Sequence, residues 1–111
     1  MAKMTPKQIG EFLALPNIAH SISLRAGSTP HSVPVWHGFS DNRSYVFTPA
    51  SSLKMRNIRN DPRISLSIAN AAKPYSYVVA SGVADIVHDG IKERFYLSHL
   101  ATKALREEQN I

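Results

Sequence analysis

The chain has 111 residues, of which 43% are hydrophobic, and this size and composition fit one globular domain spanning residues 1–111. It contains no cysteine, which excludes disulfides, thiolate metal sites and cysteine nucleophiles and favours a reducing, cytoplasmic location. The net charge of +5 favours an anionic partner, and no apolar stretch is long enough for a membrane span, so no membrane partner is expected.

The N-terminal region is predicted to form a helix followed by a strand. Thr5 and Gln8 have the spacing of a capping box, Pro6 suits the first helical position, and Pro16 ends the helix. In residues 18–25 larger, mostly apolar side chains alternate with small or polar ones, and this period of two predicts a strand. The apolar face of this strand is made of Ile18, His20, Ile22 and Leu24.

Two further strands and a short helix are predicted next. The strands are expected over 32–39 and 44–48. Pro34 favours a sheet edge, a bulge or an opening, because proline cannot donate a ladder hydrogen bond. The helix is expected over 53–60, capped by a serine at its start and ended by Asp61-Pro62.

The C-terminal half is predicted to contain two strands and a long helix. The strands cover 63–69 and 75–87, and Gly82 marks a bulge in the second. A turn at 88–90 leads into a helix from about 91 to 109, and its apolar stripe consists of Leu97, Leu100, Ala101, Ala104 and Leu105. Consecutive strands joined by short turns imply antiparallel pairing, so we expect a mainly β fold with flanking helices, a small antiparallel barrel or sandwich.

Residues 47–57 run from a strand end through a hydroxyl-rich loop into a helix N-terminus. Four of the 13 basic side chains lie within residues 54–63, and these are Lys54, Arg56, Arg59 and Arg63. Free N–H groups at a helix start, neighbouring hydroxyls and basic side chains are together the parts of a phosphate site. The residues leave open the alternative of a capped helix whose basic side chains stay in solvent.

Other kinds of site receive less support from the sequence. The five histidines lack ligand spacing, so no metal site is expected, and no serine-nucleophile elbow or glycine-rich nucleotide loop is present. Trp36, Tyr45, Tyr75 and Tyr77 can stack on a planar ring, although such residues are more often core or interface. Aromatic residues beside basic ones also allow single-stranded nucleic acid binding, but the basic residues cluster at one helix, so no nucleic acid partner is expected.

Three segments, in order, resemble the pyridoxamine-phosphate-oxidase-like split-barrel superfamily. Residues 30–36, Pro-His-Ser-Val-Pro-Val-Trp, resemble its second strand. Residues 52–66, which begin Ser-Leu-Lys-Met-Arg-Asn, resemble its phosphate-binding helix and the strand after it, and residues 73–84 resemble the next strand with its Gly-x-Ala turn. The match spans residues 8–87 and implies an antiparallel split β-barrel of the FMN-binding type.

The resemblance implies a homodimer with its cofactor, FMN or the deazaflavin coenzyme F-420, in the cleft between two protomers. The Lys-x-Arg-Asn and Pro-Tyr-Ser-Tyr pieces are closer to the deazaflavin branch. The backbone of the second strand is implied to run beside the ring, and the helix start to hold the phosphate. The cofactor-binding residues implied in this way are Val33, Pro34, Val35, Trp36, Thr48, Ser52, Lys54, Arg56 and Tyr77.

Two departures from the family pattern limit what the resemblance implies. Leu53 stands where pyridoxamine phosphate oxidases place a phosphate-binding arginine, and their pyridoxal-binding residues have no counterpart late in the chain, so oxidation of pyridoxamine phosphate is not expected. Family members usually continue from the C-terminal helix into a last strand, and this chain is expected to lack that strand, so the protein is expected to be either naturally short or a fragment of a longer product. A missing last strand would leave an open barrel edge.

The expected function is therefore that of a flavin- or deazaflavin-dependent oxidoreductase, which transfers hydride between its cofactor and a small organic substrate. No catalytic side chain is expected from the protein. The alternatives are a flavin carrier or sensor without efficient turnover and, third, a basic nucleic-acid-binding domain.

Overall fold

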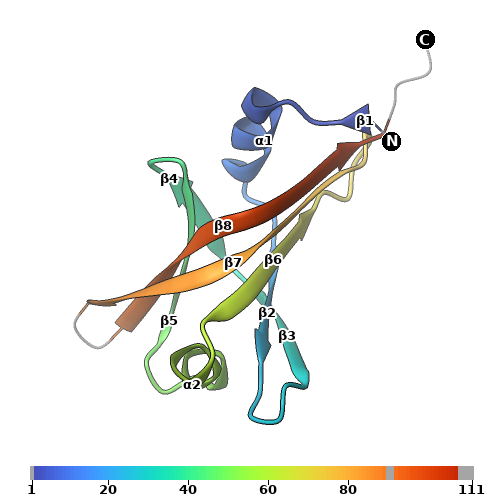
Figure 1. The fold of residues 1–111 in the computed structure, drawn as a ribbon. Coiled ribbons are helices and arrows are strands. Elements are labelled where there is room, and N and C mark those ends of the chain that lie inside the picture. Colours follow the sequence, from blue (N-terminus) through green and yellow to red (C-terminus); the bar gives the residue numbers. More distant parts are fainter. Residues whose placement is uncertain (1, 90–91, 108–111) are drawn as a thin grey trace.

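The computed structural model describes residues 2–89 and 92–107, which form two helices and eight strands (Figure 1). The elements are β1 (Ala2–Lys3), α1 (Pro6–Leu13), β2 (Ala19–Leu24), β3 (Pro30–Val35), β4 (His37–Ser40), β5 (Arg43–Pro49), α2 (Leu53–Asn60), β6 (Arg63–Ala69), β7 (Ser76–Asp89) and β8 (Lys92–Arg106). The strands form one sheet in the order β3-β2-β6-β7-β8-β5-β4, and β1 pairs with β8. Every pairing in the sheet is antiparallel among the residues described.

The sheet curls so that its two edges meet at Trp36. β3 and β4 lie at opposite ends of the strand order, yet this single residue separates them in the chain. The strand predicted over 32–39 is therefore divided in two, because the chain crosses there from one sheet edge to the other. Pro34 lies on an edge strand, where its missing N–H is tolerated. Figure 1 shows the resulting split barrel, with α1 near one end and α2 at the other, between β5 and β2.

The C-terminal segment is a strand, and the prediction of a helix over 91–109 is wrong for the residues that the structure describes. β8 pairs with β7 along almost its whole length and with residues 45–49 of β5. Residues 93–97 alternate between buried and half-buried side chains, which is the period of a strand. The segment also has helical spacing and good helix formers, but pairing with two long strands overrides that local preference. The last described element is thus a central strand rather than a helix with no strand after it.

The turn predicted at 88–90 differs as well. His88 and Asp89 still belong to β7, where they pair with Glu93 and Lys92. The rest of that turn, at residue 90, lies outside the described residues.

β2 turns its apolar residues away from the barrel interior, contrary to the predicted apolar face. The buried residues of this strand are Ala19, Ser21 and Ser23, and the partly exposed ones include Ile22 and Leu24. Ser21 lies opposite the fully buried Leu66 of β6, so a small side chain leaves room for a large one. Ser23 lies under α2 and accepts a hydrogen bond from it. Packing against the neighbouring elements therefore decides which face of β2 is buried.

The remaining predicted elements agree with the structure. α2 and β6 have the predicted bounds, and the capping box of Thr5 and Gln8 is present at the start of α1. The pairing of β7 shifts register between Ser81 and Gly82, where the bulge was predicted. The two-residue β1 was not predicted. No helix in the described part of the chain is long and apolar enough to cross a membrane.

Candidate functional site

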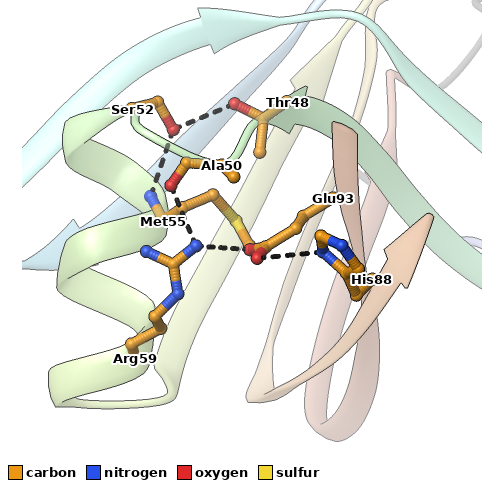
Figure 2. A network of polar contacts seen from close by, with 7 residues as sticks. All are labelled: Thr48, Ala50, Ser52, Met55, Arg59, His88 and Glu93. Atoms are coloured by element: carbon orange, nitrogen blue, oxygen red, sulfur yellow. Dashed lines mark hydrogen bonds and ion pairs between the residues drawn. The ribbon is translucent and has the colours of Figure 1, made fainter. Parts of the chain in front are cut away.

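A strand end, a turn and a helix start meet at residues 48–55 (Figure 2). Ser52 is the N-cap of α2, and its Oγ accepts a 3.3 Å hydrogen bond from the N–H of Met55. The Oγ atom also lies 3.1 Å from Oγ1 of Thr48. Thr48 is 3% exposed, so its hydroxyl holds Ser52 in place rather than reaching a ligand itself. We call residues 48–56, from the end of β5 through the turn to the first half of α2, the cradle. Ser52 is half-buried and lies at its edge.

The structure divides the four basic side chains of this region into paired and unpaired ones. Arg59 lies 2.6 Å from Glu93, and Arg63 lies 2.7 Å from Asp61. Lys54, by contrast, has no acidic partner among the described residues, and neither has Arg56. Two positive charges without a counter-ion therefore lie on the first half of α2, where the helix macrodipole adds to them.

The start of α2 also offers unused backbone donors. The N–H groups of Ser51, Leu53 and Lys54 make no hydrogen bond within the described part of the chain. The Lys54 side chain is half-buried, and this burial lowers its pKa. The Lys54 ammonium is therefore partly shielded from water, whereas Arg56 is exposed. A bound anion would accept hydrogen bonds from the free N–H groups and compensate the desolvated ammonium.

An ion-pair network fixes the turn that leads into α2 (Figure 2). Nη2 of Arg59 donates to the carbonyl oxygen of Ala50 at 2.9 Å and to Oε2 of Glu93 at 2.6 Å. The other oxygen of Glu93 lies 3.5 Å from Nδ1 of His88. Glu93 is 8% exposed, and its pKa is lowered chiefly by the hydrogen bond from Arg59. A buried carboxylate therefore stays ionised beneath the cradle and neutralises Arg59.

A groove lined by aromatic side chains lies beside the crossing from β3 to β4, next to β5. A cavity of about 320 Å³ is lined by Trp36, His37, Gly38, Tyr45 and Phe47. Trp36 is 75% exposed and Phe47 50% exposed. The rings of Tyr45 and Phe47 pack edge to face with 5.5 Å between their centroids. The groove has the size of a small ligand site. Phe47 directly precedes Thr48 in β5, so their side chains point to opposite faces of that strand: Phe47 is exposed in the groove and Thr48 is buried.

His37 contributes no charge to this groove at neutral pH. Burial lowers the pKa of His37, an effect that the backbone of Asn17 and of Leu13 partly offsets. Neither ring nitrogen makes a hydrogen bond of normal geometry to the described residues. With an ordinary pKa near 6.5 moved downward, the imidazole is neutral at pH 7.

The predicted cofactor-binding residues fall into three places. Those from the helix start, Thr48, Ser52, Lys54 and Arg56, lie together at the cradle. Those from the second strand, Val33, Pro34, Val35 and Trp36, lie on edge strand β3 and at the crossing to β4. Tyr77 lies at the end of β7 that is remote from the cradle, three strands from β3 and one row beyond the row that joins Val78 to Val35.

The separation of Tyr77 from the cradle follows from the register of the sheet. Thr48 pairs with Glu93, and Glu93 pairs with His88, so these three residues form one row across the strands. Tyr77 is eleven residues from His88 along β7, a path of roughly 35 Å at about 3.3 Å per residue. One protomer therefore does not bring Tyr77 to the cradle.

Glu93 and the Ala50 carbonyl were not predicted as part of the site, and Arg59 was predicted only as one of the clustered basic side chains, not as the partner of a carboxylate. Glu93 was missed because its segment was interpreted as a helix. The alternation of Glu93, Phe95 and Leu97 with polar or aromatic neighbours is the signal of a strand. Among residues 2–89 and 92–107, no group of three or more histidine, aspartate or glutamate side chains is placed to hold a metal ion.

Several solved structures have the same fold. A conserved hypothetical protein from Mycobacterium tuberculosis aligns with a TM-score of 0.87 at 18% identity, covering 94% of this chain and 86% of its own. An FAD-binding protein from Mesorhizobium loti aligns with a TM-score of 0.83 at 15% identity, covering 97% of each chain. An F-420 reductase aligns with a TM-score of 0.77 at 19% identity, covering 83% of this chain and 93% of its own.

Sequence comparison gives the family. No curated protein sequence matches the chain. The sequence profile of the family described as pyridoxamine 5'-phosphate oxidase, however, matches residues 5–110, which is nearly the whole chain. The chain therefore belongs to the pyridoxamine 5'-phosphate oxidase family.

Proposed function

We propose that the protein binds FMN or coenzyme F-420 and acts as an oxidoreductase on a small organic substrate. The observation that carries this proposal is the pair of uncompensated cations, Lys54 and Arg56, beside free N–H groups at the start of α2. A phosphate group supplies the negative charge and the acceptor oxygens that this cradle lacks. The F-420 reductase and the FAD-binding protein with the same fold add support for a cofactor of this class.

The residues present fit such a cofactor. Ser52, Lys54 and Arg56 would hold its phosphate, and the backbone of residues 33–36 would border its ring. When bound, the cofactor supplies the hydride transfer, while the protein supplies position and electrostatics. The exposed rings of Trp36 and Phe47 offer the substrate a flat apolar surface beside that site.

Oxidation of pyridoxamine phosphate itself is not part of the proposal. Leu53 is exposed at the first position of α2, where the resemblance led us to expect an arginine in enzymes with that activity. An apolar side chain there gives the cradle one cation fewer than those enzymes have.

We further propose that the protein is a homodimer with the cofactor in the interface. Tyr77 supports this arrangement, since it is too far from the cradle of its own protomer to share a ligand with Lys54. It contributes to a cofactor site only when a second copy brings its Tyr77 to the cleft.

The first experiment is a fluorescence titration of the purified protein with FMN and, in parallel, with F-420. Dissociation constants in the micromolar range or below for either cofactor would support the proposal and name the cofactor. Binding of neither would refute it. A carrier or sensor would bind the cofactor equally well, so bound reduced cofactor is then mixed with electron acceptors. Reoxidation supports the oxidoreductase, and its absence supports the carrier.

A second candidate function rests on the outer face of β5 and β8. The Arg43 guanidinium lies 4.3 Å from the centroid of the Tyr96 ring, and Arg94 lies 5.5 Å from the rings of Phe47 and Tyr96. Alternating arginines and aromatic rings can stack single-stranded bases. We rank this function second because Arg43 is already paired with Asp85 at 3.2 Å. Its signature is affinity for oligonucleotides that falls steeply with salt, without a bound chromophore.

A further inference from the structure

The side chain of Arg59 connects the turn before α2 to a buried carboxylate on β8. Its Nη2 atom donates both to the carbonyl of Ala50, at 2.9 Å, and to Glu93, at 2.6 Å (Figure 2). The turn itself is closed by a 3.0 Å hydrogen bond from the N–H of Ser52 to the carbonyl of Pro49. Arg59 therefore fixes the one peptide group of this turn, between Ala50 and Ser51, that the turn's own hydrogen bond leaves out.

Fixing that carbonyl also fixes the direction of the neighbouring donor. The peptide unit is planar and trans, so the N–H of Ser51 points opposite to the carbonyl of Ala50. The carbonyl points at Arg59, and the N–H of Ser51 consequently points away from it and stays free within the described residues. If the peptide rotated, it would present a carbonyl oxygen on the side where an anion needs a donor.

Arg59 and Glu93 cancel each other's charge. Glu93 is 8% exposed and lies opposite Thr48 in the sheet, so without Arg59 it would place a bare negative charge beneath the cradle. A cation that is already neutralised attracts a phosphate weakly, so attraction of the ligand does not explain why Arg59 is there.

We infer that Arg59 and Glu93 are positioning residues of the anion site, which hold the Ala50–Ser51 peptide so that the Ser51 N–H faces the phosphate. This inference rests on the proposed function for the identity of the ligand. The positioning itself concerns any phosphate, including inorganic phosphate, and is therefore testable without a flavin.

The test compares three variants for FMN, riboflavin and inorganic phosphate. Arg59→Met removes the hydrogen bonds that join the Ala50 carbonyl to Glu93 through Arg59. Arg63→Met is the matched control, because it removes a paired cation from the adjoining segment without touching the turn. Glu93→Gln keeps the shape of the side chain but releases the charge of Arg59. We expect Arg59→Met to weaken FMN binding about tenfold, the scale of one lost hydrogen bond to a charged group. The same variant should leave riboflavin affinity unchanged, and Arg63→Met should leave FMN affinity within about twofold of wild type.

Glu93→Gln separates positioning from simple attraction by the sign of its effect. If Arg59 acted through its charge, releasing that charge would tighten FMN binding. A positioning role predicts weaker FMN binding in Glu93→Gln, because a neutral amide oxygen holds the Arg59 guanidinium less firmly than a carboxylate does, although the protein becomes more positive. Tighter binding in Glu93→Gln, or an equal loss in Arg59→Met and Arg63→Met, would overturn the inference.

The readout that does not depend on flavin is an amide NMR titration with inorganic phosphate. In the wild type we expect phosphate to shift the amide signals of Ser51, Leu53 and Lys54, and in Arg59→Met the shift of Ser51 should be lost. Wild-type protein that responds to phosphate in this way but binds neither FMN nor F-420 would refute the proposed function and leave the positioning role standing. A Ser51 amide that phosphate does not shift in the wild type would refute the positioning role.

Discussion

Lys54 differs from the other basic residues of its region in being half-buried without an acidic neighbour among the described residues. Burial removes water from the Lys54 ammonium and so lowers its pKa. A bound phosphate would compensate this loss of hydration with an opposite charge. We expect Lys54→Ala to weaken FMN binding by about 1.5–3 kcal/mol, the range for a hydrogen bond to a charged group. Fluorescence titration measures this change, and riboflavin, which lacks the phosphate, serves as the ligand control. Equal losses for FMN and riboflavin would place Lys54 outside the phosphate site.

Gly38 is required by its neighbour rather than by its backbone. A Cβ atom at this position would overlap the Tyr45 ring, and Tyr45 is held by contacts with Phe47 and Tyr96. We therefore expect Gly38→Ala to lower the free energy of unfolding by about 1–3 kcal/mol, as overpacking usually does.

The matched control for this substitution is Gly10→Ala. A Cβ atom there meets nothing within 4 Å, and alanine suits a helix better than glycine by about 1 kcal/mol. Urea denaturation of both variants should show opposite signs. A Gly38→Ala variant as stable as wild type would mean that the Tyr45 ring moves freely out of the groove.

At the scale of elements, α2 is held to the barrel at two places. The first turn is tied to β5 through Ser52, and the second half is tied to β2, where Nδ2 of Asn57 donates to Oγ of Ser23 at 3.1 Å. Asn57 is 4% exposed, so removing its amide leaves a cavity and a buried hydroxyl without its partner. We expect Asn57→Ala to destabilise the protein by about 1–3 kcal/mol in urea denaturation.

Asn60 provides the control for that element. It lies in the last position of the same helix, is exposed, and makes no side-chain hydrogen bond within the described residues. Asn60→Ala should therefore change stability by less than about 0.5 kcal/mol. Similar effects of the two substitutions would show that the buried hydrogen bond to β2 adds little to holding α2 in place.

The elements differ in how far local sequence determines them. α2 and β6 were predicted with their bounds because capping residues, Asp61-Pro62 and a clean alternation all act within a few residues. β8 was not, since its residues carry both a helical and an alternating pattern, and only the pairing with β7 and β5 decides between them. The same division holds for the site. The cradle was predicted from a contiguous segment, whereas Glu93 reaches it from a strand 34 residues beyond Arg59.

At the scale of the whole molecule, the reversed face of β2 is the feature that local patterning could not give. Alternation shows that one face is apolar, but it does not show which side the barrel interior lies on. In the structure Ile22 and Leu24 face outward and line a cavity of about 350 Å³ with Ser65 and Ser81, and Val83 on β7 is also exposed. A group of apolar side chains gathered on an outer face of the sheet is typical of a surface that another protein chain covers.

This outward apolar face supports the proposed homodimer and gives it a test. We expect light scattering at micromolar concentration to return twice the mass of the 12.3 kDa chain. Leu24→Glu should shift the protein toward the monomer, because a charge buried in an apolar interface is costly. Lys7→Glu, an exposed charge reversal on α1, is the control and should leave the dimer intact. If the cofactor lies in the interface, the monomeric Leu24→Glu variant should also lose FMN binding although Lys54 and Ser52 are unchanged. A wild-type protein that is monomeric at this concentration would contradict the shared cleft, and a monomeric variant that still binds FMN would place the whole cofactor site within one protomer.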